Sequence, residues 1–218
     1  MTLAAIAALN ACGQSEGTTA APPSAQSASP VSDPSPLANA PVSAQAASVD
    51  VWATLSPETF RKLYDELAQA NGDDTIKRMS KTKDGVAVVL SDTQFQRGVA
   101  EMKKLDLANG RFKSKLGIRL SIDSKGGVTK ITVVGDRSDP INLMRFIGAV
   151  GVVNTMLNPG LDEKANTDFL ATLGLMRGDD DPSVGQPVSS FNHGGAFQCV
   201  SMPSDQTTGV GCVVEPRS

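Results

Sequence analysis

The sequence has few of the residues from which active sites and metal centres are usually built. Of its 218 residues, one is histidine, three are cysteine and nine are aromatic. With His193 alone, and with cysteines that have other expected roles, the usual zinc ligands cannot be brought together. The sequence has no G-x-S-x-G elbow, Walker loop or glycine-rich nucleotide fingerprint. We therefore expect no assembled catalytic set, no cofactor and no metal.

Two short patterns remain as chemical alternatives. His193-Gly194-Gly195 is similar to the oxyanion loop of some esterases, so a hydrolase that uses His193 with an acidic partner is one alternative function. Asp179-Asp180-Asp181 clusters the carboxylates that calcium favours, but it lacks the D-x-[DN]-x-[DN]-G spacing that directs successive ligands to one ion. We interpret the first pattern as a loop histidine and the second as a solvated acidic loop.

The first quarter of the chain has no aromatic residue, since all nine lie at or beyond Trp52. Residues 13–50 contain 6 Pro, 9 Ala and 8 Ser among 38. A segment of this composition cannot bury enough apolar surface to fold, and it indicates an extended tether. We expect residues 1–11 to be a signal peptide, 12–50 a disordered tether and 51–218 a single globular domain.

A short apolar segment, Thr2 to Leu9, precedes the first cysteine and ends in Leu9-Asn10-Ala11-Cys12. These four residues resemble the lipobox of bacterial lipoproteins. The resemblance implies that the peptide is cut before Cys12, which then receives acyl chains such as palmitate. No Lys or Arg precedes the apolar segment, so we expect the true start codon to lie upstream. Gly13, rather than Asp, follows the cysteine, and this resembles the default signal for the outer membrane, facing the periplasm.

The longest apolar run, Pro140 to Asn158, predicts a central buried helix. Asp139 can cap it, Pro140 suits the first helical position, and Asn158-Pro159-Gly160 ends it. The alternative is a membrane span, which needs about 20 predominantly apolar residues. This run of 19 residues carries Asn142, Arg145 and Asn154. We therefore favour the core helix of a folded domain.

The rest of the domain alternates helices with hairpins, which predicts an α+β fold: a mainly antiparallel sheet of two hairpins packed on the central helix. Ser91-x-x-Gln94 matches a capping box at the start of the second helix, which we expect to end at Asn109-Gly110. The other predicted helices are Pro57 to Asn71 and Leu161 to Met176. The predicted strands are Ile76 to Ser80, Val86 to Leu90, Leu116 to Ile122, Val128 to Val134, Phe197 to Met202 and Val210 to Glu215.

The last two strands each carry a cysteine. Cys199 and Cys212 lie directly opposite each other if the turn is centred on Asp205-Gln206. Exported proteins meet an oxidising compartment, so we predict a disulfide between them. The three cysteines are then accounted for: Cys12 for lipid, and the other two for the bridge.

The charge is unevenly distributed, with 11 Lys/Arg against 4 Asp/Glu from Lys77 to Arg119. This basic region could contact anionic lipid or protein, although a solvated face is the simpler interpretation. It lacks the interleaved aromatics of a nucleic-acid surface, so we expect no nucleic acid partner. We predict a non-enzymatic lipoprotein, anchored through Cys12, that binds another macromolecule, most simply a periplasmic protein. An immunity or inhibitor lipoprotein that neutralises a toxic envelope hydrolase is the alternative form of this role.

Overall fold

The computed structural model describes residues 50–105, 113–178, 180–181, 183–202 and 209–217. All of them belong to the second of the two units into which the chain divides, Gln45–Ser218. The predicted signal peptide, Cys12 and almost all of the predicted tether lie outside the described residues. The fold described below is therefore that of the predicted globular domain.

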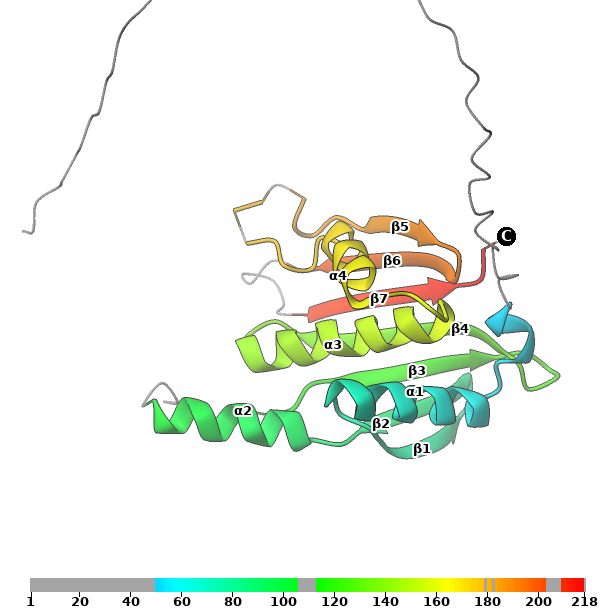
Figure 1. The fold of residues 1–218 in the computed structure, drawn as a ribbon, viewed down its shortest axis with the longest axis horizontal. Coiled ribbons are helices and arrows are strands. Elements are labelled where there is room, and N and C mark those ends of the chain that lie inside the picture. Colours follow the sequence, from blue (N-terminus) through cyan, green and yellow to red (C-terminus); the bar gives the residue numbers. More distant parts are fainter. Residues whose placement is uncertain (1–49, 106–112, 179, 182, 203–208, 218) are drawn as a thin grey trace, which may run out of the picture. The chain divides into compact units, whose positions relative to one another are not determined.

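One antiparallel sheet is the framework of this domain (Figure 1). Its strands follow the order β1-β2-β3-β4-β7-β6-β5, and every neighbouring pair is antiparallel. The pairing of β4 with β7 joins the first four strands to the last three. The strands are β1 (Ile76–Thr82), β2 (Gly85–Leu90), β3 (Gly117–Ile122), β4 (Val128–Asp136), β5 (Val188–Asn192), β6 (Gly195–Ser201) and β7 (Gly209–Glu215).

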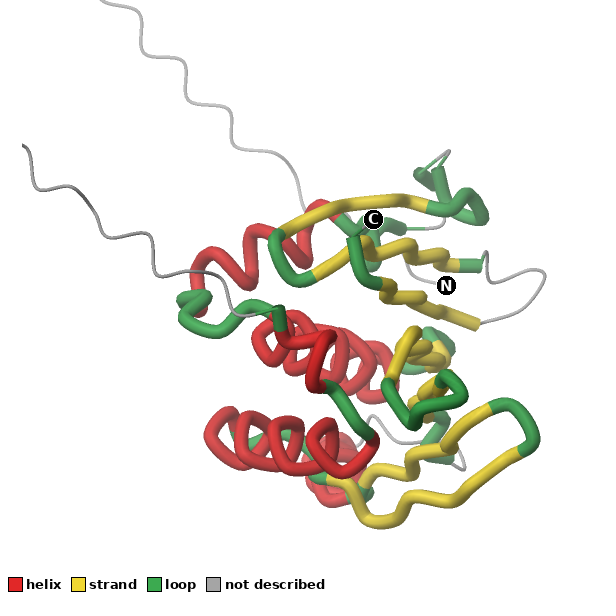
Figure 2. The backbone as a smooth tube through the Cα atoms, turned by 90° about the vertical axis from the view of Figure 1, so that its right-hand side faces the viewer, coloured by secondary structure: helices red, strands yellow, loops and turns green. Residues whose placement is uncertain are grey.

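The helices lie on one side of this sheet (Figure 2). They are α1 (Pro57–Asn71), α2 (Thr93–Lys104), α3 (Pro140–Leu157) and α4 (Glu163–Thr172), and a short 3-10 turn, Val51–Thr54, precedes them. The predicted α+β class, with an antiparallel sheet packed on the central helix, is confirmed. The helix layer is a consequence of the strand pattern, because alternate residues of each strand are apolar and need a cover.

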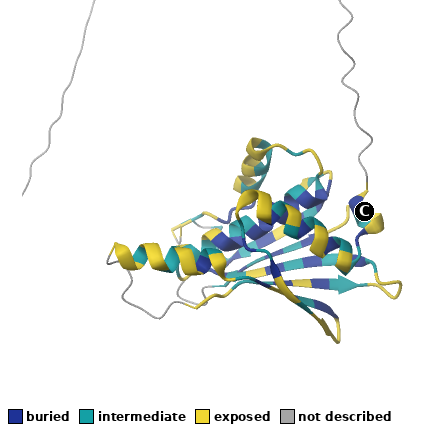
Figure 3. Cartoon of the chain, turned by 60° about the horizontal axis from the view of Figure 1, so that its bottom comes forward, coloured by how far each residue is buried: buried dark blue, intermediate teal, exposed yellow. Residues whose placement is uncertain are grey.

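The core lies between the sheet and this helix layer, and the strands alternate buried with more exposed positions (Figure 3). Cross-strand register places buried residues opposite each other: Val88 faces Ile118, and Val133 faces Cys212. The same register places Arg119 opposite Thr132 on the other face. One face of the sheet is thus the floor of the core, whereas the other is only partly apolar.

Helix α3 crosses the middle of the layer and begins where the sequence predicts, with the Asp139 carboxylate accepting from the Asn142 amide at 2.8 Å. It is the one helix among the described residues that is long and apolar enough to cross a membrane, and most of it is buried within the fold. Gly151 allows α4 to come close, since a Cβ there would lie 3.3 Å from the Leu170 side chain. The prediction of a buried core helix agrees with this packing.

Two local predictions need correction, and one strand was missed. Ser91 does not cap α2, because its hydroxyl donates to the Asp74 carboxylate and the helix begins only after Asp92. The fourth helix is shorter than predicted, since it spans Glu163–Thr172 and ends in a turn at Gly174. Strand β5 was not predicted, because its pattern is polar and it lies at the sheet edge. The predicted end of α2 at Asn109-Gly110 lies outside the described residues.

The predicted pairing of Cys199 with Cys212 is present in the structure. The two residues are direct cross-strand partners on β6 and β7, and their sulfur atoms are bonded. Both are buried on the face that the helices cover. The turn between the two strands, where Asp205 and Gln206 were placed, lies outside the described residues.

Removing this disulfide should lower the free energy of unfolding by about 3 kcal/mol, because a cross-link over a separation of 13 residues restricts the unfolded chain. The double variant Cys199→Ala/Cys212→Ala, compared with the oxidised wild type by urea denaturation, measures this loss. Reductant should shift the wild-type midpoint and leave the double variant unchanged. Equal midpoints for the two oxidised proteins would contradict the prediction.

Candidate functional site

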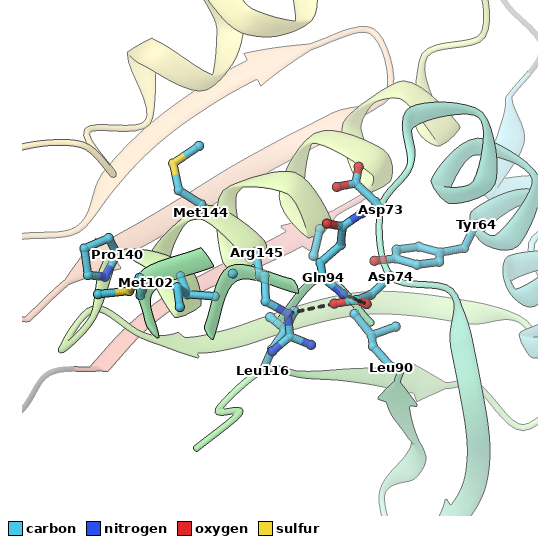
Figure 4. A pocket seen from close by; sticks show the side chains of 13 residues that line it. Tyr64, Asp73, Asp74, Leu90, Gln94, Met102, Leu116, Pro140, Met144 and Arg145 are labelled. Atoms are coloured by element: carbon cyan, nitrogen blue, oxygen red, sulfur yellow. Dashed lines mark hydrogen bonds and ion pairs between the residues drawn. The ribbon is translucent and has the colours of Figure 1, made fainter. Parts of the chain in front are cut away.

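A cavity of about 470 Å³ opens between α2 and the N-terminal half of α3, and it reaches inward to α1 (Figure 4). Its volume is in the range of small-molecule sites. The walls are mainly apolar and come from α1, β2, α2, α3, the α1–β1 turn and the segment before β3. The larger apolar side chains are Leu90, Met102, Leu116, Ile141 and Met144. The polar side chains are Tyr64, Asp73, Asp74, Gln94 and Arg145.

Asp74, in the turn between α1 and β1, is buried at the inner end of the cavity. One of its carboxylate oxygens accepts hydrogen bonds from the Ser91 hydroxyl and from the backbone amide of Gln94, both at 3.0 Å. The Gln94 amide is one of the first N–H groups of α2, which lack partners within the helix. Asp74 therefore caps α2 from a distant part of the sequence, and it takes the place of the local cap that Ser91 was predicted to supply.

Arg145 extends from α3 to the other oxygen of Asp74, with 2.7 Å between Nε and Oδ2. Both side chains are about 95% buried. The guanidinium also lies over the Phe95 ring, 5.3 Å from its centroid. In all it donates to groups on four residues, Asp74, Ser91, Asp92 and Ser114. A buried charge is tolerated only when it is paired and hydrogen-bonded in this way.

The α1–β1 turn, which carries the acidic pair Asp73 and Asp74, depends on two glycines. Gly72 ends α1 with φ of 75°, in the left-handed region that glycine adopts without strain. On α3, a Cβ at Gly148 would lie 2.9 Å from an Asp73 carboxylate oxygen. Glycine at position 148 thus allows the turn to press against α3, and Asp73 and Asp74 both reach the cavity.

Tyr64, on α1, is fully buried where it lines the cavity, and its side chain points toward the acidic pair (Figure 4). Its hydroxyl has no hydrogen-bond partner among the described residues. Burial raises the pKa of Tyr64 far above its usual value, and the charges of Asp73 and Asp74 raise it further. The hydroxyl therefore keeps its proton, and it can both donate and accept a hydrogen bond.

Asp73 is half-buried beside Asp74. Burial raises the pKa of Asp73 above its usual value, and the neighbouring charge of Asp74 adds to the rise, while a hydrogen bond with Asn71 opposes it. Within the cavity lining, two carboxylates thus accompany the single guanidinium of Arg145. The inner end carries an excess of one negative charge when both acids are ionised.

The arrangement suits binding of a ligand with an apolar body and one polar end. Met102 and Met144, on facing helices, offer flexible side chains that adapt to different shapes. Met144 is 58% exposed, so it stands at the mouth rather than in the interior. The polar groups gather at the opposite, inner end, where low dielectric strengthens each polar contact.

The residues that the sequence singled out do not meet at this cavity. Cys12 lies outside the described residues, and Cys199 and Cys212 form the bridge between β6 and β7. His193 is exposed in the turn between β5 and β6, a hairpin at the other end of the sheet from β1. That turn is fixed by the Trp52 indole, which donates to the Gly194 carbonyl at 2.6 Å. His193 makes no side-chain hydrogen bond or ion pair with the described residues.

The predicted acidic loop is partly described. Asp179 lies outside the described residues. Asp181 is partly exposed, and hydrogen bonds from the Ser183 side chain and backbone amide lower its pKa. Arg177 pairs with Asp181 at 3.6 Å. In the described part of the chain, no three His, Cys, Asp or Glu side chains are grouped so that they could hold a metal ion.

The basic region, Lys77 to Arg119, is divided between a sheet edge and the surface around α2. Strand β1 is an edge strand, and its Lys77, Arg78 and Lys81 are exposed. Charged residues on an edge hinder pairing with another sheet, which gives these three a structural role. Other members have counter-charges: Lys115 pairs with Asp136, and Arg119 pairs with Asp84.

Tyr64, Asp73, Asp74 and Arg145 were not predicted as a site from the sequence. One signal was present, since Arg145 stands within an otherwise apolar helix and a buried charge requires a partner. The partner itself could not be found from spacing, because Asp74 is 71 residues away along the chain. Tyr64 occupies an ordinary core position of α1, and nothing local distinguishes it.

Comparison with known proteins gives no further guide to this site: no protein-family model, no curated protein and no solved structure matches the chain.

Proposed function

We propose that this chain is a lipid-anchored envelope protein whose α+β domain acts as a binding module. In this proposal acylated Cys12 holds it at the outer membrane, facing the periplasm. Residues 13–50 then separate the domain from the membrane surface. The domain binds its ligand at the cavity between α2 and α3 without transforming it.

The membrane anchor is supported by the sequence of the N-terminal segment. Leu9-Asn10-Ala11-Cys12 resembles a lipobox, and the Pro, Ala and Ser content of residues 13–50 suits a spacer. The bridge between Cys199 and Cys212 is compatible with an oxidising compartment. Several acyl chains anchor a protein far more firmly than one, so such a domain would stay at the membrane.

The observation that carries the binding role is the cavity itself. It combines mainly apolar walls with a buried polar end that contains an unpartnered tyrosine hydroxyl, Tyr64. A few convergent polar groups in an apolar pocket are the usual features of a ligand site. The exposed Met144 at the mouth favours a partner that covers it. A macromolecule can do this while one of its side groups enters the cavity.

Binding rather than catalysis is favoured by where the chemical groups lie. His193, the candidate base suggested by the sequence, is on the β5–β6 turn, whereas the cavity is lined from α1 to α3. Inside the cavity the most reactive groups are restrained: Asp74 and Arg145 are engaged with each other, and Tyr64 keeps its proton. The groups present can recognise a ligand, and none is arranged as a nucleophile next to a base.

The anchor is tested by intact mass spectrometry of the protein made in its native host. We expect a chain that begins at Cys12 and carries acyl chains on that residue. The variant Cys12→Ser should leave the membrane fraction, whereas Cys199→Ser should remain in it. An unmodified Cys12 thiol with residues 1–11 still attached would contradict the anchor.

The binding role of the cavity is tested with N-phenyl-1-naphthylamine, a dye that is uncharged at neutral pH and fluoresces in apolar sites. The wild type should bind it, and Met144→Trp should lower the affinity by about tenfold or more, because the larger side chain fills the mouth. Met176→Trp is the matched control, since Met176 is 67% exposed and lies outside the cavity lining. Equal affinities for the two variants would contradict a ligand site at this place.

A further inference from the structure

Given that the cavity is a ligand site, as proposed above, we propose that the group it receives is a primary ammonium on an apolar stem. Three features of the cavity favour this ligand: the charges at its inner end, the Tyr64 hydroxyl, which has no partner among the described residues, and the apolar path that leads to them.

The charges at the inner end do not balance. Asp73 and Asp74 line it together, and Arg145 is the single cation in the lining. Arg145 is turned toward Asp74, with Nε at 2.7 Å, and its remaining bonds go to Ser91, Asp92 and Ser114. It therefore neutralises Asp74, and no Lys or Arg among the described residues forms an ion pair with Asp73. A ligand that brings one positive charge would restore neutrality in a place where desolvation makes an unbalanced charge costly.

The hydrogen-bonding groups match the same ligand. The carboxylate of Asp73 is an acceptor. The Tyr64 hydroxyl has no partner among the described residues, so its oxygen can also accept a hydrogen bond. An ammonium group has three donors and no acceptor, so it can satisfy Asp73 and Tyr64 together. A carboxylate ligand would instead meet the charge of Asp73 with a like charge, which disfavours it.

The path to these groups is apolar. Leu90, Leu116 and Ile141 line it, and Met102 and Met144 stand on the facing helices (Figure 4). Apolar walls favour burial of an aliphatic or aromatic stem in proportion to the area removed from water. The ligand class is thus an amine whose stem spans the apolar part and whose ammonium reaches the acidic end.

This chemistry has two sources, a free amine and the lysine side chain of a protein partner. Both have the same ammonium, which is protonated at neutral pH. They differ in what lies outside the mouth. A lysine continues into a polypeptide that would cover Met144, whereas a free amine ends within the cavity.

The test compares three ligands of equal chain length: n-hexylamine, n-hexanol and n-hexanoate. Calorimetry on the full chain, made as Cys12→Ser so that no detergent is needed, measures each affinity. We expect hexylamine to bind about tenfold more tightly than hexanol, because a charge-assisted hydrogen bond is gained, and hexanoate to bind more weakly than either. This comparison needs no variant in the cavity, so it does not depend on how well a variant folds.

Two substitutions identify the groups that recognise the ammonium. Asp73→Asn should lower the affinity for hexylamine by about tenfold and leave that for hexanol unchanged. Asp84→Asn is the matched control at the β1–β2 turn, and it should change neither affinity. Tyr64→Phe should weaken hexylamine binding without lowering the unfolding midpoint, because no hydrogen bond within the described residues is lost.

Nα-acetyl-lysine methylamide distinguishes the two sources. Affinity equal to that of hexylamine assigns the cavity to a lysine side chain, and binding of hexylamine alone assigns it to a free amine. Both results support the ammonium. If hexanol or hexanoate binds as tightly as hexylamine, the proposed preference for an ammonium group is wrong, while the cavity remains a ligand site. If none of the ligands binds, the proposed binding role of the cavity fails as well.

Discussion

The ion pair between Asp74 and Arg145 is the interaction on which the helix layer and its cavity depend. One oxygen of Asp74 caps α2 through the Gln94 amide, and the other holds Arg145 of α3 at 2.7 Å. A single carboxylate thus connects the end of α1, the start of α2 and the N-terminal half of α3. Because both charges are buried, loss of either one leaves the other without compensation in a medium of low dielectric. The pair therefore sets the positions of the cavity walls and of its polar end.

Much of the fold could be predicted because its determinants are local. The cap at Asp139, the alternation in the strands and the symmetric spacing of Cys199 and Cys212 each act within a few residues or one hairpin. The join between β4 and β7 could not be predicted in this way. It links strands that are far apart in the sequence, and their partners are selected by the packing of α3 over both.

The candidate site could not be predicted from the sequence either, because its residues are far apart along the chain. Ser91 has the spacing of a helix cap, yet the start of α2 is capped by the carboxylate of Asp74, which comes from the α1–β1 turn. An ionised acceptor makes a stronger hydrogen bond than a neutral hydroxyl, which explains the outcome. The resulting site is assembled from residues of α1, α2, α3 and the α1–β1 turn, so its members show no common motif. The only indication of this site in the sequence was the presence of polar residues within the apolar α3.

The proposed anchor and the cavity together are consistent with the proposed binding protein at the envelope. In that proposal the tether, predicted from composition, lets the domain reach partners near the membrane, and the cavity gives a specific chemical contact once a partner is close. The charged side chains on edge strand β1 hinder pairing of that edge with another sheet. In the proposed function, recognition depends on the polar end of the cavity, where Arg145 and Asp74 are paired.

The most direct test of this account is a double-mutant cycle on the buried pair, measured as free energies of unfolding by urea denaturation. Asp74→Asn and Arg145→Met should each cost about 3–5 kcal/mol, and the double variant should cost clearly less than their sum. The exposed pair Lys164–Asp168 is the matched control, where the same cycle should give a coupling below about 1 kcal/mol. Additive losses at Asp74 and Arg145 would contradict the claim that this pair organises the helix layer.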